Sequence, residues 1–531
     1  MPFPPAEPAE GVEAKPIISK KNEIVLFSST AIALYGYDQG MMSMVNTNRS
    51  YLRTMQIGET SPVVGIIVSV YYLGCAVGAV VASDWADKKG RKPSIFACLV
   101  TAVIGNLLMF VAGLGPHGSN PWGGAALACM IAGRVVLGLA VGGIDATIPV
   151  YSAELSKDEA RGRALAQEFQ MNIFGLLLAF AINLVATQVL GKESEWAWRI
   201  PIVCMQFFPI VLLSLISRLP ETPRWYMSKW RKEEAKEALV KMHGEDKAEE
   251  MLQELCTAQR EEDDNNEKIG YLDMLMPSGS QFHPSMVTVM GQINQALTGY
   301  GAVSVYGPQV FELLGFGVRE AEYVTLGNFI SYFMFMTVAW LWIDRYGRRK
   351  LMVWGSVGLS TCFALLSVFG YLSLDVPSVS RLAAEIPGSI VMFVATAIFG
   401  ICWLATVWLI PTEIYPSSAR AQGSAISVIV WGLANFAVTL LTPIVFNNLK
   451  YWLFLAFTAS NAFAGWWTWR YSPESGGRSF EENQEFFNSA LEEDSWVVRK
   501  VDGGKFLRMP ASSGAKGDSV EEATPLLRSR R

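Results

Sequence analysis

The sequence predicts an all-α membrane protein in which twelve transmembrane helices form two pseudo-symmetric six-helix bundles. Three observations predict this fold: long apolar blocks, basic residues in alternate loops, and loop motifs that occur twice. The 531 residues are 51% hydrophobic and only 17% charged, whereas a soluble protein carries about 25% charged residues. One bilayer crossing takes about 20 apolar residues, and the chain has room for twelve.

The apolar blocks follow one another along the chain. We predict membrane spans at 24–46, 62–83, 93–113, 124–149, 166–190, 198–217, 286–314, 321–343, 350–371, 386–413, 421–446 and 450–471. A polar tail (1–23) precedes the first bundle (24–217), and a linker (218–285) leads to the second bundle (286–471). The linker is rich in Lys, Glu, Ala and Leu, which predicts short amphipathic helices. The final segment (472–531) is predicted to be a largely disordered tail.

Basic residues in the short loops predict orientation better than net charge does. The loops between spans 2–3, 4–5, 8–9 and 10–11 hold twelve Lys and Arg residues, whereas the alternate loops hold seven. Both termini and the linker are therefore predicted to be cytoplasmic. We expect a multi-pass protein of the plasma membrane, with a vacuolar or endosomal membrane as the alternative.

Three loop motifs occur twice, in the same order and just beyond apolar helices. The offsets are 257 residues for Asp87 and Asp344, 259 for Glu154 and Glu413, and 253 for Glu221 and Glu474. The basic residues of the motifs are Arg91, Arg161 and Arg224 in the first half, and Arg348 and Arg420 in the second. Such a repeat indicates a duplicated six-helix unit.

Acids and arginines at helix ends can bridge neighbouring helices, and the motif glycines permit tight turns. We interpret these motifs as a conformational lock that holds the cytoplasmic side shut in an outward-open state. The alternative is that the basic residues only follow the positive-inside rule, although that rule needs no acids at fixed spacing.

Further motifs accompany the repeat: Gly36-Tyr37-Asp38, Arg134, Pro220-Glu221-Thr222-Pro223-Arg224-Trp225, Gln295 through Tyr306-Gly307-Pro308, and Trp408 through Pro416. With these residues the chain resembles the sugar porter family of the major facilitator superfamily, and its fungal members in particular, over nearly its whole length. The resemblance implies transport of a monosaccharide or polyol by alternating access, in which two halves rock about a central site.

Two ionisable residues lie inside predicted spans, where charge is costly and usually functional. Asp38 lies in the first span and Arg134 in the fourth. We predict that protonation of Asp38 releases Arg134 and couples a proton to the solute, as the matching pair does in the sugar–proton symporters that the chain resembles. The alternatives are a permanent structural ion pair and a facilitative carrier, because facilitative hexose carriers resemble this pattern too.

Two further acids are unexpected at their positions. Asp145 lies in the fourth span and Glu168 in the fifth, where most members of the family that the chain resembles carry small or neutral residues. Either acid could be a second proton site or a hydrogen-bond acceptor for the solute. The alternative for both is an acid at a helix end.

The resemblance places the solute site on the fifth, seventh, tenth and eleventh helices, where amides bind hydroxyls and a ring covers the sugar. The residues that it implies are Gln170, Gln295, Tyr306, Trp403, Trp408 and Asn435. Several amides of the family pattern are replaced, by Phe169, Ala296, Gly301 and Trp431-Gly432. A smaller or less hydroxylated solute, or a sugar held differently, is therefore the alternative to an ordinary hexose. The two tryptophans could instead be packing residues, and Gln295 could join two helices.

Other signals are weaker. Asn48-Arg49-Ser50 is a glycosylation sequon, and Leu526-Leu527 after Glu522 resembles a signal for sorting adaptors. The sequence shows no nucleotide loop, metal cluster or nucleophile–base set, so we expect no cofactor, no nucleic-acid partner and no enzyme activity. Rival functions are transport of a carboxylate or secondary metabolite, and a non-transporting sugar sensor.

Overall fold

The computed structural model describes residues 20–58, 61–115, 124–155, 161–264, 270–277, 279–376, 381–416, 419–476, 478, 480–492, 495–498, 501–502 and 505–506. Within these residues the chain is almost entirely helical. Nine helices or helix pairs of the described residues are long and apolar enough to cross a membrane. The first, seventh and twelfth crossings complete the twelve-helix fold.

The first bundle contains six crossings. They are α1 (Lys20–Val45), α3 (Val63–Lys89), α4 (Arg91–Val111), α5 (Ala125–Leu155), α6 (Arg161–Leu190), and the pair α7 (Glu195–Met205) and α8 (Phe207–Ile216). A short helix that the sequence did not predict, α2 (Arg49–Met55), follows the first crossing.

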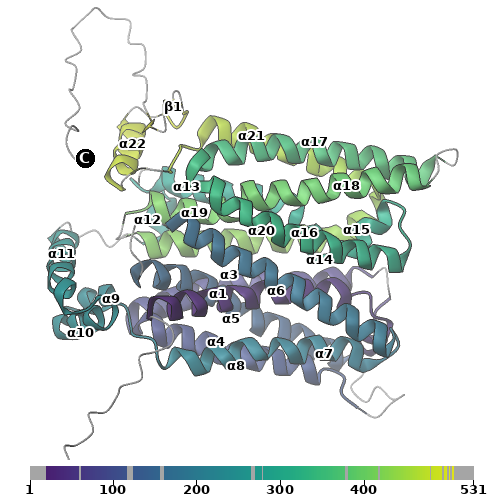
Figure 1. The fold of residues 1–531 in the computed structure, drawn as a ribbon, viewed down its shortest axis with the longest axis horizontal. Helices are drawn as coiled ribbons and strands as arrows, with labels where there is room; N and C mark the ends of the chain where they lie inside the picture. The colour runs from purple at the N-terminus through teal and green to yellow at the C-terminus, as the bar shows by residue number, and fades with distance from the viewer. Residues whose placement is uncertain are drawn as a thin grey trace, which may run out of the picture.

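The second bundle repeats this plan with more breaks. Its crossings are α13 (Phe282–Leu297) with α14 (Tyr300–Val305) and α15 (Gly307–Leu313), α16 (Val318–Tyr346), α17 (Arg348–Asp375), α18 (Arg381–Phe399) with a π-helix (Gly400–Leu404) and α19 (Ala405–Ile414), α20 (Arg420–Leu449) and α21 (Trp452–Tyr471). Figure 1 shows the two bundles side by side, and they meet where α3 packs on α20 and α6 packs on α16.

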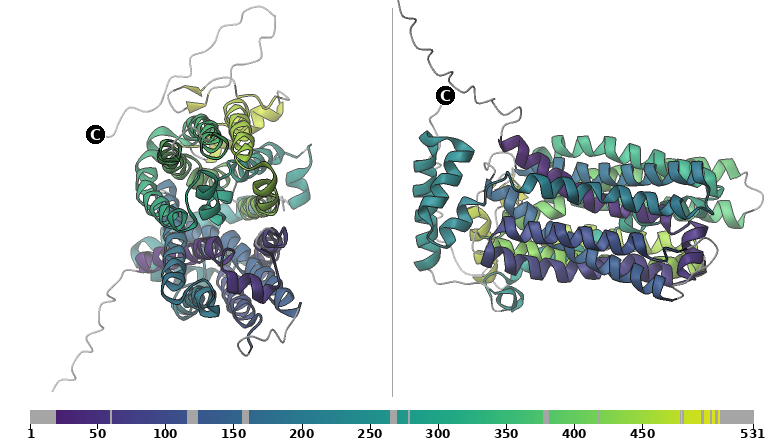
Figure 2. Two further views of the ribbon diagram at one scale, coloured as in Figure 1. Left: turned by 90° about the vertical axis from the view of Figure 1, so that its right-hand side faces the viewer. Right: turned by 90° about the horizontal axis from the view of Figure 1, so that it is seen from below.

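Helices α9 (Pro223–Ser228), α10 (Lys232–His243), α11 (Glu245–Asp264) and α12 (Tyr271–Leu275) lie at one end of the bundles, as Figure 1 and the right-hand view of Figure 2 show. The turns at Gly90 and Gly347 lie at the same end, which we call the motif end; the opposite end is the far end.

The helix α22 (Phe480–Glu492) lies at the motif end, within the segment that the sequence suggested to be largely disordered. Its Phe486 and Phe487 are buried, and Gln484 Nε2 donates to the backbone oxygen of Ile414, 2.8 Å away, at the end of α19. A two-residue antiparallel hairpin, β1 (Val501–Asp502) and β2 (Lys505–Phe506), follows.

The turns of the repeated motif are shorter than the sequence predicted. Helix α3 continues to Lys89, so Asp87 lies on the helix and Gly90 alone separates α3 from α4. Gly347 separates α16 from α17 in the same way. Their φ angles are 112° and 84°, a backbone conformation that favours glycine.

A glycine also sets the distance between α1 and α6. A Cβ atom at Gly36 would lie 1.8 Å from the backbone oxygen of Asn172, so the helices approach closely only because residue 36 has no side chain. This contact brings Tyr35 and Gln39 of α1 beside Asn172 of α6.

Candidate functional site

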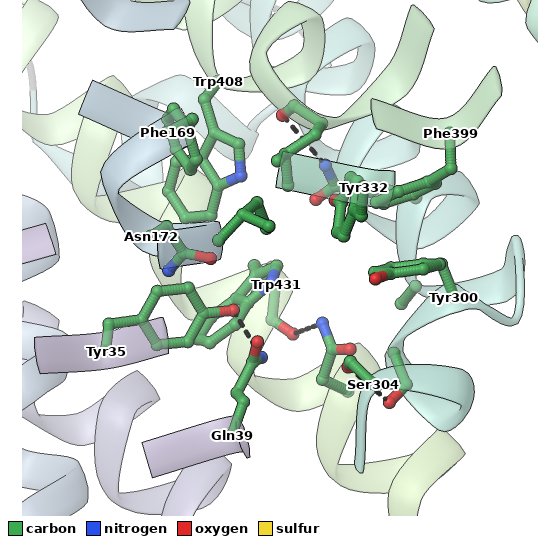
Figure 3. A pocket seen from close by; sticks show the side chains of 16 residues that line it. Tyr35, Gln39, Phe169, Asn172, Tyr300, Ser304, Tyr332, Phe399, Trp408 and Trp431 are labelled. Carbon is green, nitrogen blue, oxygen red and sulfur yellow. Dashed lines mark hydrogen bonds between the residues drawn. The ribbon is translucent and has the colours of Figure 1, made fainter. Parts of the chain in front are cut away.

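A cavity of about 450 Å³ lies between the two bundles (Figure 3). Helices α1 and α6 contribute Tyr35, Gln39, Phe169, Asn172 and Ile173, and the second bundle contributes Gln295, Ala296, Tyr300, Gly301, Ser304, Tyr332, Phe399, Leu404, Trp408, Trp431 and Asn435. These lining residues include no Asp, Glu, Lys or Arg.

The seventh crossing is broken where it reaches the cavity. Helix α13 ends at Leu297, and Gly299 takes a φ of 84° before α14 starts at Tyr300. A Cβ atom at Gly299 would lie 2.6 Å from the ring of Phe457. Broken helices inside a membrane protein line cavities. Figure 3 shows the hydroxyl of Tyr300 pointing into this one.

The tenth crossing changes its winding beside the cavity. Its π-helix shifts the backbone carbonyls from the α-helical pattern, and such turns are frequent at functional sites. Gln295 uses this change, because its Nε2 donates to the backbone oxygens of Trp403 at 3.3 Å and Leu404 at 3.2 Å.

Three lining amides are held in one orientation by backbone carbonyls. Besides Gln295, Asn435 Nδ2 donates to the Trp431 oxygen at 2.9 Å and Asn172 Nδ2 donates to the Ile32 oxygen at 3.4 Å. A carbonyl only accepts hydrogen bonds, so the nitrogen of each amide must face it. Each amide therefore leaves its oxygen to accept from another group.

Three of the six expected solute-binding residues line the cavity: Gln295, Trp408 and Asn435. Gln295 also makes the interhelical hydrogen bonds that the alternative interpretation expected. The ring of Trp408 packs against Phe169 and Trp431, with centroids 5.6 and 5.8 Å away.

The structure places the other three outside the lining. Gln170 lies about 100° round α6 from the lining residue Phe169, and its Nε2 donates to the Phe333 oxygen at 3.2 Å. Trp403 lies in the π-helix and is fully buried in the core of the second bundle. Tyr306 donates its hydroxyl to the backbone oxygen of Thr439 at 3.2 Å.

The sequence interpretation missed seven polar or aromatic lining residues, namely Tyr35, Gln39, Asn172, Tyr300, Ser304, Tyr332 and Phe399. Helical spacing was a usable signal for some of them. Tyr35 and Gln39 are four residues apart, and Asn172 lies three residues after Phe169, so each pair shares a helix face.

Asp38 and Arg134 form a buried ion pair inside the first bundle. Arg134 NH1 donates to Asp38 Oδ1 at 2.5 Å, and each residue is 1% exposed. The guanidinium also donates to the Ile67 oxygen at 3.2 Å and lies 4.6 Å from the ring centroid of Tyr71. Neither residue lines the cavity, but the lining residue Gln39 follows Asp38 directly.

The two unexpected acids also lie beyond the cavity lining. Glu168 is 3% exposed, and Ser152 Oγ donates to its Oε1 at 3.1 Å. Asp145 is half-buried on α5. Glu168 adjoins the lining residue Phe169, so a charge change there would act next to the cavity.

At the motif end of the first bundle, charged groups join three segments. Arg91 lies 3.0 Å from Asp87 and 3.2 Å from Glu154. Glu221, just before α9, accepts from the backbone N–H groups of Arg91 and Lys92. Burial raises the pKa of the Glu221 carboxyl, and these backbone donors oppose that shift.

The second bundle repeats this arrangement. Arg348 lies 3.0 Å from Asp344 and 2.6 Å from Glu413. Glu474 accepts from the backbone N–H groups of Arg348 and Arg349 at 2.7 and 3.1 Å. The sequence offsets thus correspond to equivalent contacts, and each cluster joins helices within one bundle.

The remaining charged residues of the motifs lie at or near helix starts. Arg224 lies on α9, and Arg420 starts α20 half-buried. The backbone of Arg161 starts α6, whereas its side chain, like Leu526 and Leu527, lies outside the described residues.

At the far end, an ion pair crosses between the bundles. Lys192, just after α6, places Nζ 2.5 Å from Oε1 of Glu322 on α16, and the Glu322 side chain is 1% exposed. Asn48 also lies here, but it is buried as the N-cap of α2 and accepts from the Tyr51 N–H at 3.0 Å. Its Nδ2 is buried in this structure, and use of the sequon stays a prediction.

Comparisons with known proteins agree with this architecture. A family profile described as "Sugar (and other) transporter" matches residues 24–487. The chain is 30% identical over 470 residues to the major myo-inositol transporter IolT of Bacillus subtilis, covering 88% of this chain and 94% of that protein. It is 26% identical to the glucose transporter GlcP of Staphylococcus epidermidis, covering 87% and 97% of the two chains.

A fungal relative and a solved structure are also similar. The MFS-type transporter oryC of Aspergillus oryzae is 28% identical, with coverage of 88% of this chain and 85% of the relative. A structure of the proton:xylose symporter XylE bound to 6-bromo-6-deoxy-D-glucose matches with a TM-score of 0.74 and 23% identity, over 88% of this chain and 99% of that chain. At that identity the match establishes the fold.

Proposed function

We propose that this chain, which belongs to the sugar (and other) transporter family, carries an uncharged hydroxylated solute, a sugar or polyol, across a membrane by alternating access. The observation that carries the proposal is the cavity between the bundles, because both bundles line it and its polar groups are amides and hydroxyls. Relatives named as transporters of myo-inositol and of glucose support the same class of solute.

A carboxylate is a poorer candidate for this cavity. Its charge would need a cationic partner to offset the loss of hydration, and no Lys or Arg belongs to the lining. The guanidinium of Arg134 already binds Asp38. A non-transporting sensor is the remaining alternative, and measurable flux of any solute would exclude it.

We place the motif end in the cytoplasm, since the basic loops lie there. The segments 1–23, 218–285 and 472–531 are then cytoplasmic, and the plasma membrane is the proposed location. The Arg91 and Arg348 clusters are proposed to act in the closing of the cytoplasmic side by stiffening the two bundles. Because each cluster joins helices of one bundle, it would keep that bundle rigid while the two bundles rock.

Asp38 is the proposed site of proton coupling. Its carboxylate is buried and held only by the Arg134 guanidinium among the hydrogen bonds described for it. Protonation would remove the attraction that holds the two side chains at 2.5 Å. The change would reach the solute through Gln39, which donates to the hydroxyls of Tyr35 and Tyr72. Glu168 and Asp145 are proposed as secondary proton sites.

The test is radiolabelled solute uptake in a yeast strain that lacks its own hexose carriers, across hexoses, pentoses, cyclitols and acyclic polyols. Wild type is compared with Asp38→Asn, with and without a protonophore. The matched control is Asp84→Asn, because Asp84 pairs with Lys88 on the surface and is 58% exposed.

We expect the protonophore and Asp38→Asn each to abolish accumulation, whereas Asp84→Asn transports as wild type does. Accumulation that survives both would make Asp38 a structural residue and the protein a facilitative carrier. No uptake of any compound, with the protein present at the cell surface, would contradict the proposed function.

A further inference from the structure

The cavity is rich in aromatic rings. Seven of its lining residues are aromatic, and they come from both bundles. On one side the Trp408 ring packs on Phe169 and Trp431. On the other side Tyr300 stacks on Phe399, with centroids 4.3 Å apart and planes within 18°.

These rings are fixed by one another, so the cavity is preformed. Trp431 makes edge contacts with Tyr35 at 5.2 Å and with Tyr72 at 5.3 Å. Aromatic groups that already pack in this way lose little conformational freedom when a ligand arrives. A flat apolar ring in the solute would gain offset or edge contacts on both sides.

The fixed amides of the lining present hydrogen-bond acceptors. Gln295, Asn172 and Asn435 each donate from the amide nitrogen to a backbone carbonyl, so each amide oxygen is left to accept. Ala296 and Gly301, which also line the cavity, supply no polar side chain. A solute can therefore donate its own O–H groups to the amide oxygens.

Resting on the proposed function, we infer that the transported solute is an uncharged compound that joins hydroxyl donors to a flat aromatic ring, the chemistry of an aryl glycoside. The hydroxyls donate to the amide oxygens of Gln295, Asn172 and Asn435. The aryl ring lies among the seven aromatic side chains.

The test compares ligands that share one sugar and differ in one group. Phenyl β-D-glucopyranoside, methyl β-D-glucopyranoside and phenyl β-D-glucuronide are titrated into the purified full-length protein by calorimetry, and their uptake into cells is measured by mass spectrometry. We expect the phenyl glucoside to bind at least tenfold more tightly than the methyl glucoside, and the charged glucuronide at least tenfold more weakly than the phenyl glucoside.

Phe399→Leu removes one ring of the lining while keeping an apolar side chain. We expect it to reduce the preference for phenyl over methyl glucoside about tenfold. The matched control is Phe463→Leu, because Phe463 on α21 is 45% exposed and lies outside the lining; it should keep the wild-type preference.

The outcomes separate the two proposals. Binding of the methyl glucoside as tight as that of the phenyl glucoside, with uptake of sugars or polyols intact, overturns the aryl inference and leaves the proposed function standing. Equal binding of the glucuronide overturns it as well, since the lining would then accept a charge. The absence of both binding and uptake for every glycoside, sugar and polyol overturns both proposals.

Discussion

Replacement of Lys192 by Met should destabilise the protein far more than a surface lysine replacement. Lys192 is the partner of Glu322, whose side chain is 1% exposed and whose Oε2 has no hydrogen-bond partner in the described chain. Removal of one partner of a buried pair costs about 3–5 kcal/mol, because the remaining charge is uncompensated. The Lys192 side chain is 29% exposed, so we expect the low end, about 3 kcal/mol.

The assay is the free energy of unfolding of purified protein in mixed detergent micelles titrated with SDS. Lys88→Met is the control, because Lys88 pairs with Asp84 at 2.7 Å on the surface, with 69% and 58% of the side chains exposed; it should cost under about 0.5 kcal/mol. The double variant Lys192→Met/Glu322→Leu should lie within about 1 kcal/mol of wild type, since no buried charge is left. If Lys192→Met costs no more than Lys88→Met, the pair is solvated and the reasoning is refuted.

Two further changes test the motif end. Gly90→Ala should lower the free energy of unfolding by about 1–2 kcal/mol. The reason is that φ is 112° and the added Cβ atom would lie 2.4 Å from Glu221 Oε2. A free energy of unfolding equal to that of wild type, measured by SDS titration, would contradict this. Phe487→Ser should detach α22, because the Phe487 side chain is only 1% exposed. Its removal costs about 2 kcal/mol of the free energy gained by burying an apolar side chain. Limited trypsin digestion should then cleave after Arg470 or Arg478 faster than in wild type, and an unchanged cleavage rate would show that other contacts hold the helix.

Hydropathy predicted the crossings well because apolar length is a local property of the sequence. Hydropathy did not predict the helix ends, because a helix can continue through polar residues. The second span was predicted to end at 83, yet α3 continues through Asp87 to Lys89. The backbone hydrogen bonds of a helix continue through charged residues at a membrane surface, and only Gly90 interrupts them. Small helices such as α22 were missed since their stability depends on distant partners such as Ile414.

The solute site was less predictable, because it depends on how each helix is rotated. Phe169 and Gln170 are adjacent, and the sequence favoured the amide, but Phe169 lines the cavity and Gln170 binds the Phe333 oxygen. Trp403 was expected in the solute site, but it lies in the π-helix and outside the lining. No residue pattern indicated this change of winding. Gln295 lies in the lining, where the sequence placed it, because it belongs to the regular part of α13, before the break.

Helices α6 and α16 pack together along a seam between the two bundles, and rocking of the bundles must separate contacts along it. Beside the cavity, Gln170 donates to the Phe333 oxygen across the seam, and at the far end Lys192 binds Glu322 across it. The residues that separate Glu322 from Phe333 span about 16 Å of α16, which is about half the thickness of a bilayer core. The Gln170 contact thus lies near the middle of the membrane and the ion pair near one face, so opening the far end along this seam breaks the ion pair while the Gln170 contact acts as the pivot. Since the Arg91 and Arg348 clusters stiffen each bundle internally, the cost of opening falls on these crossing contacts, and the charged pair makes the far end the more costly one to separate.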